Sequence, residues 1–138
     1  MSKRERNMIK LIKSSVLLLC LFLTACVTVQ EDQPIIVNGA AGYLERIALP
    51  QGCSINIAIV DLDTRGVILA QKNFDIARAP VPFKFILPAD TVKSNANYAV
   101  VAMIRYQGQV IFQTYDQFPV INNGKFTTEV MMKAVPGK

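Results

Sequence analysis

Histidine and tryptophan are both absent from this chain of 138 residues. Without histidine, the chain lacks the commonest general base, the usual serine and cysteine triads, and most zinc or copper sites. It also lacks a glycine-rich loop followed by a helix, which is the usual platform for nucleotide phosphates. We therefore predict a protein that is not an enzyme and that uses no cofactor and no metal ion.

Residues 26–138 also lack an excess of charge of one sign. The whole chain carries 15 basic and 10 acidic residues, a net charge of +5. Residues 1–25 hold five of the basic side chains and one of the acidic ones, which leaves ten against nine in residues 26–138. No basic patch is left to favour nucleic acid as a partner. A stretch as long as residues 26–138 is the size of one ordinary domain.

Residues 1–25 have the layout of a bacterial export signal. A basic segment, which stays on the cytoplasmic side of a membrane, comes first. Residues 14–23 then form an apolar run of ten residues, within the roughly 7–15 of a signal peptide and short of the ~18 of a spanning helix. Small residues, Thr24 and Ala25, precede Cys26, as a peptidase needs at its cleavage site. We predict that residues 1–25 are a signal peptide; the alternative is an uncleaved signal anchor that contains a cysteine.

The four residues Leu23-Thr24-Ala25-Cys26 resemble the lipobox of bacterial lipoproteins. This resemblance implies that the nucleophilic Cys26 thiolate takes a diacylglyceryl group and becomes the N-terminus. Two or three acyl chains attach a protein stably, because each buried methylene contributes about 0.8 kcal/mol. The next residue is Val27, whereas in lipoproteins of enteric bacteria an aspartate there causes retention in the inner membrane. The resemblance therefore implies an anchor in the outer membrane of a Gram-negative bacterium, on its periplasmic face.

Cysteine is too scarce for an internal disulfide after cleavage. Cys20 leaves with the signal peptide and Cys26 carries lipid, so Cys53 remains alone. We interpret Cys53 as a buried, small apolar residue at the start of a strand; the alternative is a redox or dimer site. Residues 26–35 are then the lipidated N-terminus and a polar tether, and residues 36–134 are the folded domain.

Short apolar stretches alternate with turn residues throughout residues 36–134, which favours β-strands. Isoleucine recurs at every second position over residues 55–59, and the most apolar stretch, residues 98–106, is expected to be a central strand. Gly108-Gln109 fits a two-residue hairpin turn of type II′. Seven or eight strands at this spacing predict an all-β fold, a single small β-sandwich of mainly antiparallel strands. No stretch of ten or more residues in the domain has a helical period, so we expect little helix.

Glycine and proline give further local predictions. We expect a strand over residues 36–49, in which Gly39 and Gly42 mark a bulge. Pro80 and Pro82 exclude a central strand at their own positions, because proline cannot donate to a neighbouring strand.

One stretch begins like a calcium loop, but its pattern breaks at two ligand positions. Asp61 and Asp63 are suitably spaced, whereas Arg65 places a cation where an oxygen belongs and Lys72 replaces the chelating glutamate. We interpret the two aspartates as parts of a solvated turn whose side chains bond the local backbone. Paired carboxylates for glycoside chemistry would need two acids facing a cleft, and Asp116 stands alone.

A group of apolar residues in the last quarter of the chain is the best candidate for a binding surface. Methionine and aromatic side chains favour adaptable surfaces of this kind. The alternative is that these residues fill the core of the sandwich. They are Tyr115, Phe118, Val120, Ile121, Met131 and Met132.

Four stretches resemble the YbaY/YscW-type family of bacterial lipoproteins, and together they cover about residues 36–123. The resemblance implies a small β-sandwich lipoprotein of the Gram-negative outer membrane, and it carries over no site residue except Cys26. Some members act as pilotins, which bind a secretin subunit and carry it to the outer membrane for type III secretion. The YbaY-like members, to which the pair Glu45-Arg46 is closer, have no settled activity. The stretches are Gly42–Pro50, Pro82–Phe85, Tyr98–Val100 with Ala102 and Ile104, and Phe118–Val120.

The sequence therefore predicts an outer-membrane-anchored, non-enzymatic binding or assembly module, similar to a pilotin or chaperone. Its expected partners are the membrane, through the lipid, and a protein of the envelope or of a secretion system, held at a strand edge or in a groove. The alternative is a structural envelope lipoprotein that contacts lipid or glycan and has no specific protein client.

Overall fold

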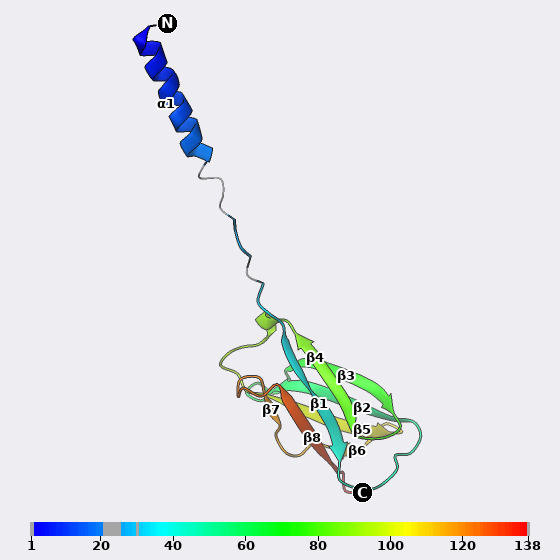
Figure 1. The fold of residues 1–138 in the computed structure, drawn as a ribbon. Coiled ribbons are helices and arrows are strands. Elements are labelled where there is room, and N and C mark those ends of the chain that lie inside the picture. Colours follow the sequence, from blue (N-terminus) through cyan, green and yellow to red (C-terminus); the bar gives the residue numbers. More distant parts are fainter. Residues whose placement is uncertain (1, 21–25, 30, 138) are drawn as a thin grey trace. The chain divides into compact units, whose positions relative to one another are not determined.

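The computed structural model describes residues 2–20, 26–29 and 31–137. The chain divides into two compact units, Met1–Glu31 and Asp32–Lys138. In the first unit, helix α1 spans Lys3–Cys20 (Figure 1). Among the described residues, no helix combines the length and the apolar character needed to cross a membrane. Residues 23–25 of the cleavage motif lie outside the described residues, so the signal peptide stays a prediction.

The second unit is all-β, as the sequence predicts, and contains eight strands (Figure 1). Neighbouring strands pair in the order β3-β2-β5-β6-β8-β1-β4, and β7 pairs with β5. Every pair is antiparallel except β1 with β8. The strands are β1 (Ile35–Tyr43), β2 (Cys53–Asp61), β3 (Ile68–Ile76), β4 (Val81–Leu87), β5 (Tyr98–Tyr106), β6 (Gln109–Gln113), β7 (Pro119–Val120) and β8 (Thr127–Ala134), with a single 3-10 turn, η1 (Ala89–Thr91), before β5.

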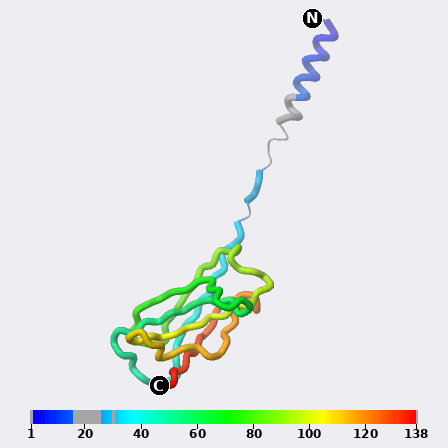
Figure 2. The backbone as a smooth tube through the Cα atoms, turned by 180° about the vertical axis from the view of Figure 1, so that it is seen from behind, coloured from blue at the N-terminus to red at the C-terminus, as the bar shows by residue number. Residues whose placement is uncertain are grey.

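The predicted two layers are present, but they are joined into one sheet. One layer consists of β4, β1 and β8, and the other of β3, β2, β5 and β6. On one side, β6 and β8 pair through Phe112 with Ala134 and Gln113 with Lys133. On the other side, β3 and β4 approach each other. Figures 1 and 2 show the strands curving round one interior, so the sandwich is nearly closed into a barrel.

Inward-facing residues at alternate strand positions fill this interior. In β2, Ile55, Ile57 and Ile59 are completely buried, as the period of two predicts. The neighbouring β5 pairs with β2, β6 and β7, which confirms its central place. Its first residue, Tyr98, is buried too, and its hydroxyl accepts a hydrogen bond from the backbone N–H of Lys93 at 2.9 Å. The polar end of this large side chain is therefore satisfied inside the fold.

Strand β1 differs from the prediction in two ways. It ends at Tyr43 rather than at Leu49, and its pairing with β4 runs without a bulge. Glycine is needed at position 39 for a reason other than a bulge, because a Cβ there would overlap the carbonyl oxygen of Thr128 on β8. Gly39 therefore allows the two parallel strands to approach closely, which is the other common use of glycine in a strand.

The hairpin between β5 and β6 turns one residue earlier than predicted. Tyr106 pairs with Gln109, so the turn residues are Gln107 and Gly108. Both have positive φ, 50° and 78°, as a type I′ turn requires. The predicted type II′ turn at Gly108-Gln109 is wrong, because the pairing of the two strands selects the residues that turn.

The two ends of the strand order are β3 and β4, and each pairs with only one neighbour. Pro82 lies within β4. Its missing N–H is tolerated because β4 has a free edge. The prediction that proline excludes a central strand here is therefore confirmed.

Candidate binding groove

The predicted lipid-attachment residue, Cys26, and Cys53 have opposite surroundings. Cys26 is exposed, and residues 26–29 have no regular secondary structure. Cys53 begins β2 and is buried, as predicted. Burial raises the pKa of the Cys53 thiol, and a protonated thiol is a poor nucleophile. Cys53 is thus a core residue, whereas the Cys26 thiol is accessible to a modifying enzyme.

The two aspartates at the end of β2 hold a turn together, and the prediction is correct only in part: Asp61 bonds the local backbone but is buried, whereas Asp63 bonds a residue far along the chain. The Asp61 carboxylate accepts hydrogen bonds from the backbone N–H groups of Asp63 and Thr64, at 2.8 and 3.2 Å. The Asp63 carboxylate accepts the backbone and side-chain N–H groups of Asn97, at 2.8 and 3.1 Å. The side-chain and backbone N–H groups of Asn97 lower the pKa of the Asp63 carboxyl. The turn is thereby fastened to the segment that leads into β5.

This bonding predicts an effect of pH on stability. Because the folded state favours the charged Asp63 carboxylate, its pKa lies below the value of about 3.9 in the unfolded chain. The stabilisation is complete above that value and is lost as the pH falls through the folded-state pKa. Asn97→Ala removes the side-chain donor, so its free energy of unfolding should fall less than that of the wild type between about pH 5 and pH 2. Urea unfolding at both pH values measures this, and an equal fall in both proteins would contradict it.

Asp116 lies apart from this turn and forms a salt bridge. Its carboxylate lies 3.2 Å from the Lys133 ammonium group on the exposed surface, where an ion pair contributes about 0–1 kcal/mol. In the described part of the chain, no three side chains that could ligate a metal gather in one place. The three aspartates are thus explained by a turn and a surface ion pair.

Half of the predicted binding surface in the last quarter of the chain belongs to the core, as the alternative interpretation has it. Val120, Ile121 and Met132 are buried. The short strand β7 pairs with β5 and places Val120 opposite Tyr98. The other members are the half-buried Phe118 and Met131 and the exposed Tyr115.

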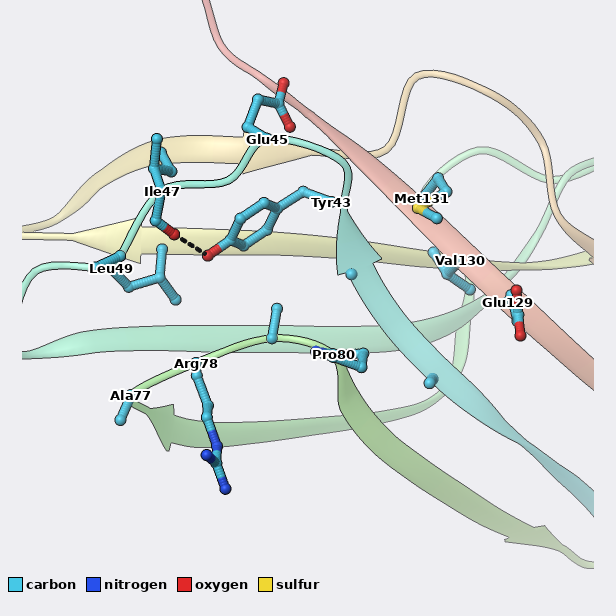
Figure 3. Close-up of a pocket in the computed structure, with 14 residues that line it drawn as sticks. Tyr43, Glu45, Ile47, Leu49, Ala77, Arg78, Pro80, Glu129, Val130 and Met131 are labelled. Carbon is cyan, nitrogen blue, oxygen red and sulfur yellow. Dashed lines mark hydrogen bonds between the residues drawn. The ribbon is translucent and has the colours of Figure 1, made fainter.

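A groove of about 480 Å³ opens beside the end of β1 (Figure 3). Three segments that are far apart in the sequence form it: residues 42–49, the β3–β4 connection over residues 77–80, and residues 129–131 of β8. Its volume is in the range of ligand-binding clefts, about 300–1,000 Å³. The larger apolar side chains that line it are Tyr43, Ile47, Leu49, Pro80, Val130 and Met131.

Tyr43 fixes the wall of the groove that residues 45–49 form. Its ring stacks on Phe112 of the core, with 4.3 Å between the ring centres. Its hydroxyl donates a hydrogen bond to the carbonyl oxygen of Ile47 at 3.1 Å (Figure 3). Burial raises the pKa of this hydroxyl, so it keeps its proton at neutral pH. One side chain therefore connects the core to the segment that carries Ile47.

Charged side chains border the apolar lining. In Figure 3, Glu45 and Arg78 lie on opposite sides of Tyr43, and Glu129 projects from β8. Within residues 31–137 these three charged groups form no salt bridge. Apolar side chains bordered by charges of both signs suit a polypeptide segment with one apolar face.

The sequence-based prediction missed this groove because it treated residues 36–49 as one strand. A signal was present: after Tyr43, the period of two fails, since Leu44 occupies a polar position and Glu45 an apolar one. That irregularity could have placed the end of the strand. It could not have shown that Arg78 and Met131 line the same groove.

Comparison with known proteins gives two sequence relationships. The profile of the family described as type III secretion system lipoprotein chaperone (YscW) matches residues 33–132. The uncharacterized lipoprotein YbaY of Escherichia coli K12 is 32% identical over an alignment of 94 residues that covers 64% of this chain and 49% of that protein. The chain thus spans about half the length of this curated relative.

A solved structure shares the fold. It is the structure of an alternative pilotin from the type II secretion system of Vibrio cholerae, with a TM-score of 0.70 and 24% sequence identity. The match covers 76% of this chain and 100% of the pilotin chain. At this level of identity the likeness shows the fold alone.

Proposed function

The chain belongs to the YscW family of type III secretion system lipoprotein chaperones, and we propose that it is an outer-membrane lipoprotein that binds another envelope protein and helps to position or assemble it. The observation that carries this proposal is the groove beside Tyr43, one wall of which comes from residues 42–49, within the stretch Gly42–Pro50 on which the family resemblance partly rests. The family and the all-β fold point to a non-enzymatic role. Binding without chemical change is accordingly the activity we assign to the groove.

Lipid on Cys26 is the proposed anchor. Residues 1–25 would be removed as the signal peptide, residues 26–35 would form the lipidated N-terminus and tether, and residues 36–134 would form the binding domain. The exposure of Cys26 supports the attachment. Val27 in the position after the cysteine supports sorting to the outer membrane.

The groove lies at the opposite end of β1 from the tether. β1 begins at Ile35, next to the tether, and its last residue, Tyr43, lines the groove. Since a strand rises about 3.3 Å per residue, roughly 26 Å separate the two ends. This spacing supports a groove that opens toward the periplasm while the domain is held at the membrane.

The partner we propose is a segment of a secretin subunit or of another secretion-system protein. An apolar stripe on that segment would pack on Ile47, Leu49 and Met131. Arg78 would attract acidic side chains, and Glu45 basic ones, which would fix the direction of the segment in the groove.

Ile47→Glu should weaken binding of this partner at least about tenfold, because it places a charge against the apolar stripe. Leu44→Glu is the matched control, since Leu44 lies in the same segment, is 81% exposed against 55% for Ile47, and does not line the groove. Binding is measured by titrating the purified lipoprotein with the secretin subunit of the same bacterium. Equal affinities of the two variants would contradict the proposal, as would recovery of glycan or lipid alone from the wild-type protein.

A further inference from the structure

The end of the domain next to the tether carries apolar side chains that the core does not use. Ile36 of β1 and Ile86 of β4 are paired across the two strands. They are 41% and 62% exposed. Cross-strand partners on one face lie about 5 Å apart, so the two isoleucines form one apolar surface, which we call the Ile36–Ile86 patch. Figure 1 shows the start of β1 beside the end of β4.

On the outer face of β4, β1 and β8, the charged side chain beside the Ile36–Ile86 patch is basic. Lys84 lies two residues from Ile86 on the same face of β4 and pairs with Asn38 of β1. On the other side of β1, Asn38 pairs with Thr127 of β8 and accepts a hydrogen bond from its hydroxyl at 2.7 Å. The first acidic side chain on the outer face of these three strands is Glu129, which lies farther along, opposite Ala40. Three acidic residues at this end lie outside the sheet: Glu31 and Asp32 belong to the tether, and the exposed Asp90 belongs to η1, which follows β4.

The tether limits how far this patch can be from the anchor. Cys26 is nine residues before Ile35, and an extended chain spans at most about 3.6 Å per residue, or roughly 30 Å in all. Val27 and Val29, near the start of the tether, are exposed and apolar as well. An acyl group on Cys26 would therefore keep the patch permanently within reach of lipid headgroups.

We infer that the Ile36–Ile86 patch, with Lys84 beside it, rests on the surface of the lipid bilayer. The two isoleucines would sit at the boundary between headgroups and acyl chains, and Lys84 would face anionic headgroups. This inference rests on the anchor proposed above and adds an orientation to it. With the patch on the bilayer, the groove at the other end of β1 stays open to the periplasm.

Depth-dependent quenching of a fluorophore tests this orientation. Ile86→Cys, Lys84→Cys and, as control, Leu44→Cys are each labelled with an environment-sensitive dye in the full lipoprotein purified from membranes. Labelling is confined to the new thiol, because Cys53 is buried and Cys26 carries lipid. The labelled proteins are reconstituted in vesicles of phosphatidylethanolamine and phosphatidylglycerol that contain a nitroxide-labelled lipid.

The dye at positions 84 and 86 should be quenched at least about threefold more strongly than the dye at position 44. Two labelled positions guard against a local disturbance at either one. Equal quenching at all three positions of acylated, vesicle-bound protein would overturn the inference. Protection of position 86 from aqueous iodide without quenching by lipid would also overturn it, because a second copy or another protein would then cover the patch. A mass that shows no acyl group on Cys26 would overturn the anchor and this inference together, so the two failures are distinguishable.

Discussion

Replacing Gly39 with alanine is expected to lower the free energy of unfolding by about 3 kcal/mol or more. The new Cβ would overlap the carbonyl oxygen of Thr128, which belongs to the backbone of β8. A flexible side chain could move aside at little cost, but a backbone carbonyl moves only with its strand. The parallel pairing of β1 with β8 should therefore be disrupted along much of its length.

Gly42→Ala is the matched control on the same strand. A Cβ at position 42 would meet Pro80 at 3.4 Å, an ordinary contact distance. We expect its stability to stay within about 1 kcal/mol of the wild type. Urea unfolding followed by circular dichroism measures both variants. If Gly39→Ala unfolds at the same urea concentration as Gly42→Ala, the close approach of β1 and β8 is wrong.

Cys26→Ser should abolish lipid attachment and outer-membrane location completely. A hydroxyl is far less nucleophilic than a thiolate, so the modifying enzyme would have no acceptor. The loss should be all or none, because stable anchoring needs at least two acyl chains. Cell fractionation and the mass of the N-terminal peptide report the two effects separately.

Cys53→Ala is the control for this substitution. Cys53 is buried at the start of β2, so its loss should leave acylation and location unchanged. An outer-membrane fraction and a protein mass that are the same for Cys26→Ser as for the wild type would refute the proposed anchor.

Local patterns predicted the parts of the fold that depend on neighbouring residues. The alternation around Ile57 placed β2, the apolar run at residues 98–106 placed β5, and Pro82 marked an edge strand. Each of these signals acts within a few residues, because burial of alternate side chains or a missing N–H is a local property.

The errors lie where pairing between distant segments decides the outcome. The β5–β6 turn falls at Gln107-Gly108 because Tyr106 pairs with Gln109. Val120 is buried because β7 pairs with β5, which no pattern near Pro119 reveals.

The groove was also missed because it depends on segments that are far apart in the sequence. Ile47, Arg78 and Met131 come from three segments, and only the curvature of the whole sheet brings them together. A sequence-based prediction could identify the family, but it could not locate this site.

The most direct measurement of the central claim is photo-crosslinking in living cells. The claim is that a lipid-anchored domain holds a segment of another envelope protein in its groove. A photoreactive residue in place of Met131, which lines the groove, should form a covalent product with a secretin subunit or another secretion-system protein. The same residue in place of Leu44, outside the groove, should not. Protein products at position 44 and none at position 131, or products with lipid alone at both, would contradict the account.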